Sequence, residues 1–249
     1  MSNFFHTIIK PPLKAIGLHK VTRALKRKFW AMEIGNKDTE SVFTDIYKKN
    51  KWGDEESISG PGSTLDETEH LRTELDALFK KLNLKTMVDL PCGDFNWFKE
   101  IDYKFEKYIG CDIVQALIDE NNEKYSDNHH FFQKLDCLTE EIPQCDLFFC
   151  RDLLIHFSND DIFRFFDNIL RSDIKWVMIS HAVNHPNENI KTGQGRLVNL
   201  TAAPFNLPQP ATIIMENAKV NNGRWKDIRS MALWRKDDIA QTLQKSKAA

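Results

Sequence analysis

Asp152 and His156 are the residues whose types and spacing best suit proton transfer. They are four positions apart, so one helical turn would bring the carboxylate and the imidazole together. Such a pair can take the proton of a weakly acidic hydroxyl while the carboxylate orients the ring. A structural alternative stays open, in which Asp152 caps the following helix and His156 packs beneath it. The sequence therefore predicts that Asp152 and His156 act as the base for a hydroxyl nucleophile.

Acidic residues also follow four consecutive segments that the sequence predicts to be strands. The predicted strands are 86–90, 107–113, 131–135 and 146–150, and the acids that end or follow them are Asp89, Asp112, Asp136 and Asp152. Parallel sheets bind ligands at the carboxyl ends of their strands. Each acid alone could be a helix cap or a turn residue, but their shared register predicts one ligand site.

The loop after the first strand limits which nucleotide could bind there. A dinucleotide site needs several glycines so that bare backbone can approach a pyrophosphate, and only Gly93 is present. Pro91 lacks an N–H donor, and Asp89 and Asp94 add negative charge. These features disfavour NAD or ATP. They suit a phosphate-free ligand that carries positive charge, such as S-adenosylmethionine.

The expected cofactor contacts follow from this register. Asp112, which lies 19 residues beyond Gly93, would accept hydrogen bonds from the ribose hydroxyls. Ile113 and Asp136 would lie near the adenine, and Pro91 to Gly93 near the methionine part. The full predicted set along the four strand ends is Asp89, Pro91, Cys92, Gly93, Asp94, Asp112, Ile113, Asp136, Cys137, Cys150 and Arg151.

The elements that must position these residues alternate between strands and helices. Helices are predicted over 65–81, 114–125 and 160–170, the last with Ser158 or Asn159 as its N-cap. Further strands are predicted over 176–180, 211–215 and 230–234. This alternation predicts an α/β fold with a mostly parallel sheet and helices on both faces.

The segment Val88–Trp97 resembles motif I of class I S-adenosylmethionine-dependent methyltransferases in a variant form with a single glycine. Gly110–Ile113 resembles the second motif, and Phe148–Phe157 resembles the fourth, which borders the methyl group and the acceptor. The resemblance implies a Rossmann-like, seven-stranded methyltransferase domain over 36–249. Residues 1–35 would form a basic helical extension, with a helix over 13–32, and residues 36–82 a segment that covers the cofactor.

The Pro-Cys-Gly-Asp-Phe-Asn-Trp stretch at 91–97 further resembles a subgroup found among surface-glycan enzymes, which are thought to O-methylate sugars. By this resemblance Trp52, Ser59, Gly60 and Ser63 would line the cofactor side, together with Arg72. The alternatives are an ordinary loop for 59–63 and a solvated helix residue for Arg72. Methyl transfer to another small molecule or to protein, and a non-catalytic binding role, remain alternative functions.

Polar and aromatic residues elsewhere could bind the acceptor. His181 and Asn184 follow the fifth predicted strand, Asn199 belongs to the stretch that resembles the subgroup, and the Trp97 ring could stack on a sugar. His181 and His185 have a spacing that suits a metal on a helix, but Pro186 and the lack of a neighbouring acid argue against one. No metal is expected. The acceptor would be a sugar or glycan, either nucleotide-linked or lipid-linked.

Charge is distributed unevenly along the 249 residues. Residues 1–32 hold seven Lys or Arg and no acid, whereas the remainder carries a net charge of −9. An acidic body disfavours nucleic-acid binding, which needs a basic face for phosphates. The basic start could contact an anionic membrane face through 10–32, or it could be a solvated or partner-docking helix. The oligomeric state stays open.

The remaining composition indicates a cytoplasmic protein, with contact to the inner membrane face as the open alternative. No apolar run approaches the ~20 residues of a membrane span, and the start lacks the pattern of a secretory signal. The five cysteines are odd in number and form no Cys-x-x-Cys pair. They are expected to be reduced, buried thiols rather than a disulfide framework or a zinc site.

Overall fold

The computed structural model describes residue 25 and residues 28–248. The chain divides into two compact units, 1–38 and 39–249, and each is described by itself. In the first unit, residue 25 and residues 28–34 are helical. Most of the helix predicted over 13–32 therefore lies outside the described residues, as do all of its basic side chains except Lys28.

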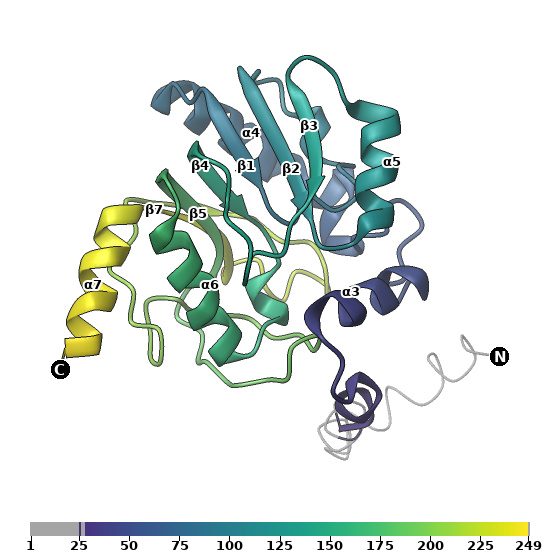
Figure 1. Ribbon diagram of the computed structural model, residues 1–249, viewed down its shortest axis with the longest axis vertical. Helices are drawn as coiled ribbons and strands as arrows, with labels where there is room; N and C mark the ends of the chain where they lie inside the picture. The colour runs from purple at the N-terminus through teal and green to yellow at the C-terminus, as the bar shows by residue number, and fades with distance from the viewer. Residues whose placement is uncertain (1–24, 26–27, 249) are drawn as a thin grey trace. The chain divides into compact units, whose positions relative to one another are not determined.

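A seven-stranded sheet forms the centre of the second unit (Figure 1). The strand order is β3-β2-β1-β4-β5-β7-β6. The pairs among β3, β2, β1, β4 and β5 are parallel, and β7 runs antiparallel to both of its neighbours, β5 and β6. The strands are β1 Thr86–Asp89, β2 Lys107–Asp112, β3 His130–Lys134, β4 Cys145–Cys150, β5 Ile174–Ala182, β6 Thr212–Met215 and β7 Arg229–Arg235. The predicted strands and the mostly parallel sheet are confirmed.

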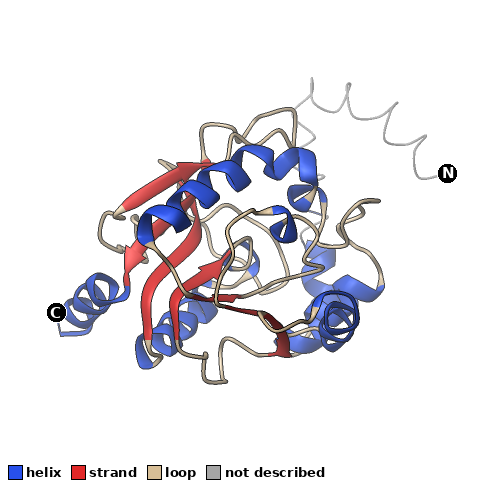
Figure 2. Cartoon of the chain, turned by 90° about the horizontal axis from the view of Figure 1, so that it is seen from above, coloured by secondary structure: helices blue, strands red, loops and turns tan. Residues whose placement is uncertain are grey.

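Helices cover both faces of the sheet (Figure 2). The helices are α3 Thr39–Lys48, α4 Leu65–Leu82, α5 Gln115–Tyr125, α6 Asn159–Arg171 and α7 Lys236–Ala248. Consecutive residues of a strand point to opposite faces. Accordingly Phe149 of β4 contacts Phe98, whereas its neighbour Phe148 contacts Phe165 of α6. The helices predicted at α4, α5 and α6 are confirmed, and α3 and α7 were not predicted.

Helix ends follow ordinary capping chemistry, which fixes where the functional loops begin. The Thr64 side chain accepts the Glu67 amide at the start of α4, and Asn83 ends that helix in the left-handed conformation. Ser158 accepts the Asp161 amide at the start of α6, so of the two predicted caps it is Ser158 that serves. The short helical turn before it, Leu154–His156, is thereby separated from α6.

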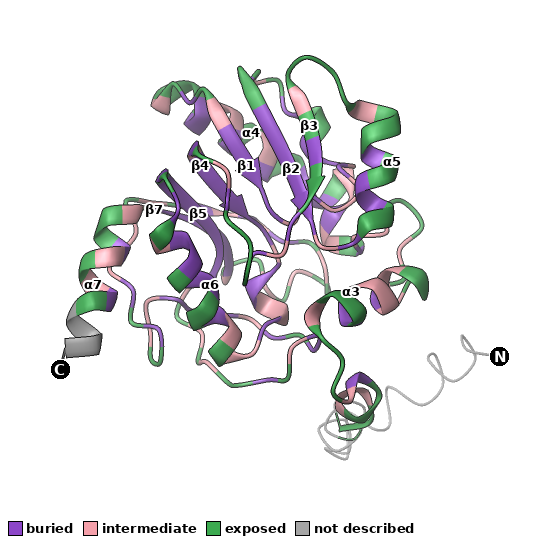
Figure 3. Ribbon diagram, in the orientation of Figure 1, coloured by how far each residue is buried: buried purple, intermediate pink, exposed green. Residues whose placement is uncertain are grey.

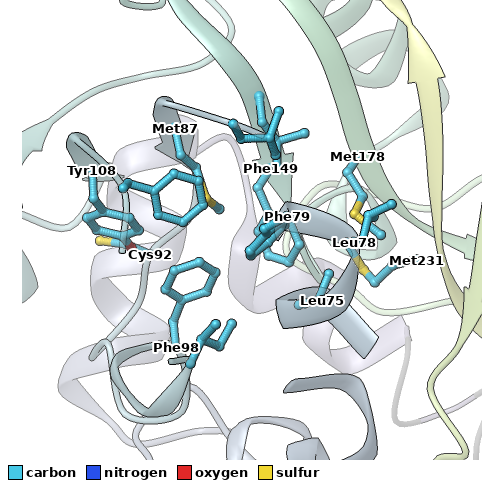
Figure 4. Close-up of a cluster of buried hydrophobic side chains, with 14 of the residues drawn as sticks. Leu75, Leu78, Phe79, Met87, Cys92, Phe98, Tyr108, Phe149, Met178 and Met231 are labelled. Atoms are coloured by element: carbon cyan, nitrogen blue, oxygen red, sulfur yellow. The ribbon is translucent and has the colours of Figure 1, made fainter. Parts of the chain in front are cut away.

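One large hydrophobic cluster packs between the sheet and the helices α4 and α5 (Figure 4). Figure 3 shows the same division, with the central strands buried and the outer surface of α5 exposed. Aromatic rings from Phe79, Phe98 and Tyr108 lie within it. All five cysteines are buried and free, as the sequence predicted. No helix among the described residues is long and apolar enough to cross a membrane.

Candidate active site

The parallel strands place the predicted acids along one edge of the sheet. Asp89 is the last residue of β1 and Asp112 the last of β2, while Asp136 and Asp152 each lie two residues beyond β3 and β4. The backbone N–H of Gly93 reaches the Asp112 Oδ2 at 3.3 Å and so ties the first loop to the second strand. The predicted strand-end constellation is therefore present.

Asp89 and Asp112 are buried carboxylates with few neutralising partners. The Tyr108 hydroxyl donates to the Asp89 Oδ2 at 2.6 Å, and the Val114 amide donates to the Asp112 Oδ1 at 2.9 Å. Burial raises the pKa of Asp89 to about 8 and that of Asp112 to about 6. Charge repulsion from Asp112 adds to the raised pKa of Asp89, and repulsion from Asp94 adds to that of Asp112. A cation or hydroxyl donor placed here would relieve this electrostatic cost.

A loop that precedes β1 in the chain is held against the first strand-end loop by Asp94. Its Oδ2 accepts the Ser57 hydroxyl at 2.8 Å and the Ile58 amide at 3.0 Å, and its Oδ1 accepts the Ser59 hydroxyl at 3.2 Å. Gly93 makes this contact possible, because a Cβ there would lie 2.3 Å from the Ser59 Oγ. Gly93 also has a φ of +55°, which favours glycine.

The rest of this covering segment reaches the residues after β4. The Trp52 ring stacks on His156 with 5.2 Å between ring centroids. Gly60 lies beneath Trp52, since a Cβ at Gly60 would be 3.0 Å from the Trp52 Cβ. The Ser63 carbonyl accepts the Asn96 side-chain amide at 3.2 Å. Segment 52–63 thus spans from the β1 loop to the β4 loop.

The residues at these strand ends fit S-adenosylmethionine better than a phosphate ligand. The Asp112 carboxylate accepts the Gly93 amide and Asp94 follows directly in the chain, so a pyrophosphate at the one glycine of the loop would be repelled. The buried Asp112 carboxylate faces backbone donors and retains lone pairs for ribose hydroxyls. The pKa of Asp112 is raised because burial disfavours its charged form. A sulfonium ligand nearby would favour that charged form.

A buried group of charges surrounds Asp152. The Arg229 guanidinium donates to the Asp152 Oδ2 at 2.7 Å and to Glu216 at 2.9 Å. Arg151 donates to the same Glu216 oxygen at 2.8 Å and to the Gly62 carbonyl at 2.9 Å. Burial acts to raise the pKa of Asp152, but Arg229 and Arg151 outweigh it and leave that pKa below its usual value. Asp152 is therefore a fixed negative charge.

His156 is oriented by a backbone carbonyl. Its Nδ1 lies 2.8 Å from the Gln194 oxygen, which can only accept a hydrogen bond. The neutral ring therefore carries its proton on Nδ1 and its free lone pair on Nε2. Burial lowers the pKa of His156 below its usual value, so this neutral form predominates near pH 7. His156 has the tautomer and charge state that a base requires.

The predicted hydrogen-bonded pair of Asp152 and His156 does not form. Asp152 is engaged by Arg229 and by the Ser180 hydroxyl, and the His156 Nδ1 by Gln194. Residues 152–156 do not form one regular helical turn, because Asp152 has a φ of +59° and a 3-10 turn begins only at Leu154. The two residues still interact through charge, which raises the pKa of His156.

Three of the predicted acceptor residues have structural partners instead. Trp97 is buried in the core, with the Arg151 guanidinium 5.2 Å above its ring. His181 is 5% exposed, its Nδ1 accepts the Leu200 amide, and burial lowers its pKa to about 4. The Asn199 side chain accepts the Thr201 amide and hydroxyl. All three side chains are buried, and their burial cannot be predicted from their positions in the sequence.

Asn184 is exposed, has a φ of +53°, and lies two residues beyond β5. Arg72, on α4, donates to the Leu65 carbonyl of its own helix at 3.1 Å. Neither residue joins the group around Asp152 and His156 through a hydrogen bond. Their predicted roles therefore gain no support from the contacts that they make.

The remaining predicted cofactor residues divide into buried and partly exposed ones. The Asp136 oxygens accept the Leu138 amide and the Thr139 hydroxyl, so this acid caps a turn. The side chains of Cys92, Cys137 and Cys150 are buried, and Cys150 is fully so. Pro91 and Ile113 stay partly exposed at the ends of their strands.

Several residues that shape the site were not predicted from the sequence. Tyr108 holds Asp89 across two neighbouring strands, Arg229 holds Asp152 from the far end of the chain, and Glu216 accepts a hydrogen bond from Arg229. Gln194 acts through its backbone carbonyl, so its side-chain type carries no signal. A buried Tyr in a strand and a charged residue entering β7 were the only local hints available.

No known family profile matches the chain, and no curated protein sequence matches it. Solved structures do share its fold. Magnesium protoporphyrin IX methyltransferase (ChlM) from Synechocystis PCC 6803, with bound SAH, aligns with TM-score 0.54 and 13% identity over 80% of this chain and 99% of that chain. The N-methyltransferase NodS from Bradyrhizobium japonicum WM9, in complex with S-adenosyl-L-homocysteine, aligns with TM-score 0.55 and 10% identity over 76% and 97%.

A third structure, the DhpI–SAH complex, aligns with TM-score 0.54 and 14% identity over 78% of this chain and 93% of that chain. At these identities the likeness concerns the fold. The strand order, the single antiparallel strand and the helices on both faces agree with it. The chain therefore has the Rossmann-like fold of class I methyltransferases.

Proposed function

We propose that this protein is an S-adenosylmethionine-dependent O-methyltransferase whose acceptor is a sugar hydroxyl in surface-glycan biosynthesis. The observation that carries the proposal is the His156 ring, neutral and with its free lone pair on Nε2, beside the carboxyl end of β4. The fold supports the class of reaction. The resemblance of residues 91–97 to sugar-modifying enzymes supports the acceptor.

The cofactor would be held at the ends of β1 and β2. Asp112 would accept the ribose hydroxyls, and the loop at Gly93, against which Ser59 packs, would border the methionine part. Bound there, S-adenosylmethionine supplies an electrophilic methyl group, so the protein needs mainly to position the acceptor. Segment 57–59 is fixed by Asp94 and would cover this side of the cofactor. Burial raises the pKa of Asp89 to about 8, and a cationic ligand bound nearby would lower it again by favouring the ionised form.

His156 would remove the acceptor proton. A sugar hydroxyl is a weak nucleophile, and a base within hydrogen-bond reach assists its attack. The Nε2 of His156 takes the proton, while the Gln194 carbonyl keeps the proton on Nδ1 in place. Asp152 stays ionised because Arg229 and Arg151 lower its pKa. Its charge stabilises the imidazolium that forms, which is its proposed part in the reaction.

Trp52 supports the choice of a sugar as acceptor. Its ring is partly exposed and stacks on His156, so an aromatic surface adjoins the proposed base. The C–H faces of pyranose rings pack on such surfaces, which suits a glycan acceptor that is nucleotide-linked or lipid-linked. Membrane contact through residues 10–32, of which the structure describes residue 25 and residues 28–32, remains a prediction, as does the cytoplasmic location.

Calorimetric titration with S-adenosylmethionine and S-adenosylhomocysteine tests the cofactor proposal. We expect saturable binding that Asp112→Ala weakens by about tenfold or more, since a buried hydrogen bond to a charged group contributes about 1.5–3 kcal/mol. Asp102→Ala, at an exposed acid, is the matched control and should bind like the wild type. A folded protein that binds neither ligand would contradict the proposal.

The acceptor is tested by transfer of labelled methyl from S-adenosylmethionine to a panel of acceptors. The panel contains nucleotide-linked deoxyhexoses, lipid-linked glycans, a small phenol and a peptide. Labelled sugar that is absent with His156→Ala supports the proposal. Label in the phenol or peptide alone would keep the methyltransferase class and overturn the sugar acceptor.

A further inference from the structure

A cavity lies on the face of the sheet that α5 covers, apart from the strand-end site. It has a volume of about 300 Å³ and opens between the end of α5 and the loop that precedes β2. The buried rings of Phe98, Phe105 and Tyr108 form its floor. The more exposed rings of Tyr103 and Tyr125 stand at its sides. Half of its lining residues are thus Phe or Tyr.

The size and walls of this aromatic cavity suit a flat ring system. An apolar cavity of about 150 Å³ already holds a benzene molecule, so this volume admits a fused pair of rings. Aromatic side chains prefer edge-to-face or offset contacts with such a ligand. The ring of Phe95 also lines the cavity and contacts both Tyr108 and Tyr125, which keeps the walls in place.

The mouth of the aromatic cavity is positively charged. Lys99, Lys104 and Lys124 line it, and all three are exposed. Among the described residues Lys104 has no ion-pair partner, whereas Lys124 pairs with Glu120 at 3.0 Å. The Lys99 Nζ lies 5.6 Å from the centre of the Tyr125 ring, at the edge of the opening. A negative group on a ligand would meet these ammonium groups.

The one carboxylate in the lining, Asp127, offsets only part of this charge. Asp127 accepts the backbone amides of His129 and His130 and faces the His130 Nδ1 at 3.0 Å. These hydrogen bonds lower the pKa of Asp127 to about 2, so its charge is fixed and directed at its own turn. Glu120 offsets Lys124 and Asp127 offsets one further lysine, so Lys99, Lys104 and Lys124 together leave a net positive charge beside the opening, which favours an anion.

We propose that the aromatic cavity is a binding site for a flat aromatic molecule that carries one carboxylate or phosphate. The ring enters between Tyr103 and Tyr125 above the aromatic floor, and the anionic group remains at the mouth beside Lys99 and Lys104. Tyr108 also holds Asp89 through its hydroxyl, so the cavity and the strand-end site share one residue.

Calorimetric titration of the full chain with 2-naphthoate and with neutral 2-naphthamide tests this proposal. We expect saturable binding of 2-naphthoate, with 2-naphthamide weaker by about tenfold. Lys104→Gln should weaken 2-naphthoate binding by about fivefold, the scale of an exposed charge pair, and leave the amide unchanged. Added salt should weaken the acid and not the amide.

Lys81→Gln, at an exposed lysine on α4 away from the cavity, is the matched control and should bind 2-naphthoate like the wild type. Tyr125→Ala removes one wall at a partly exposed position and should weaken both ligands. Circular dichroism of each variant verifies folding. Equal affinity for the acid and the amide, equal weakening by Lys81→Gln, or no binding of 2-naphthoate would each overturn the proposal.

Discussion

The His156 Nδ1 lies 2.8 Å from the backbone carbonyl oxygen of Gln194, which is 38 positions further along the chain. A carbonyl can only accept, so this contact assigns the proton of the neutral ring to Nδ1 and leaves Nε2 free. In many sites with a histidine base, a carboxylate orients the imidazole ring. Here Asp152 is committed to Arg229, and a backbone group orients the ring instead.

His156→Ala should lower methyl transfer by about 10²–10⁴-fold, the usual contribution of a positioned base. Binding of S-adenosylhomocysteine should persist, because His156 lies after β4 and Asp112 ends β2. Turnover and calorimetric affinity measured on the same preparation separate the two effects. Turnover within twofold of the wild type would show that His156 is not the base.

The rate should rise with pH and then level off. Burial lowers the pKa of His156 below 6.5, so protonation removes the base only in acid. As pH increases through that lowered pKa, the neutral ring accumulates and turnover increases; above it the profile is flat. A pH–rate profile of kcat/KM checks this, with His156→Gln as the variant that should lack the ascending limb. A midpoint above 7 would contradict the assignment.

Asp89→Asn should stabilise the protein at alkaline pH. Burial raises the Asp89 pKa from 3.8 to about 8 in the folded state, so folding holds a proton that the unfolded chain releases. The free energy of unfolding therefore decreases as pH rises from about 4 to 8, by up to about 1.4 kcal/mol per pH unit. Urea unfolding at pH 5 and pH 9 measures this slope.

The variant should flatten that slope, since asparagine does not titrate and its oxygen can still accept the Tyr108 hydroxyl. Asp119→Asn, at an exposed acid on α5, serves as the control and should keep the slope of the wild type. Identical slopes for wild type and Asp89→Asn would mean that Asp89 ionises normally in the folded protein.

Gly93→Ala should displace segment 57–59. The added Cβ would lie 2.3 Å from the Ser59 Oγ, and the backbone φ of +55° costs a non-glycine residue about 1 kcal/mol more. We expect lower thermal stability and weaker cofactor affinity. The double variant Gly93→Ala with Ser59→Gly should recover part of both, because only the steric cost is removed. A double-mutant cycle gives the coupling, and strict additivity would exclude the contact.

Arg229→Gln should destabilise the fold by about 3–5 kcal/mol, since it leaves Asp152 and Glu216 buried with less compensating charge. Arg164→Gln is the matched control: its side chain is 55% exposed and pairs with Asp161 at the surface. That substitution should cost about 1 kcal/mol or less. Urea unfolding compares the two, and similar small losses would show that the buried charges are dispensable.

The sequence by itself determined the sheet and the edge where the site lies. Apolar runs such as 146–150 and helical periodicity in 65–81 are local patterns, and each predicts its own element. The acids Asp89 and Asp112 end their strands by position in the chain, so their place at the carboxyl edge follows from a parallel sheet. Ser158 was readable as a cap for the same reason, since its partner is three residues away.

Only the tertiary structure decided which partners those residues have. Arg229 meets Asp152 across 77 positions, and Trp52 stacks on His156 from a segment that precedes the whole sheet. Burial separated His181, which packs below the surface, from His156, which lies in the site. These outcomes depend on which loops pack together and on how much water each side chain keeps. Neither quantity is encoded in a short stretch of residues, because both arise from contacts between distant parts of the chain.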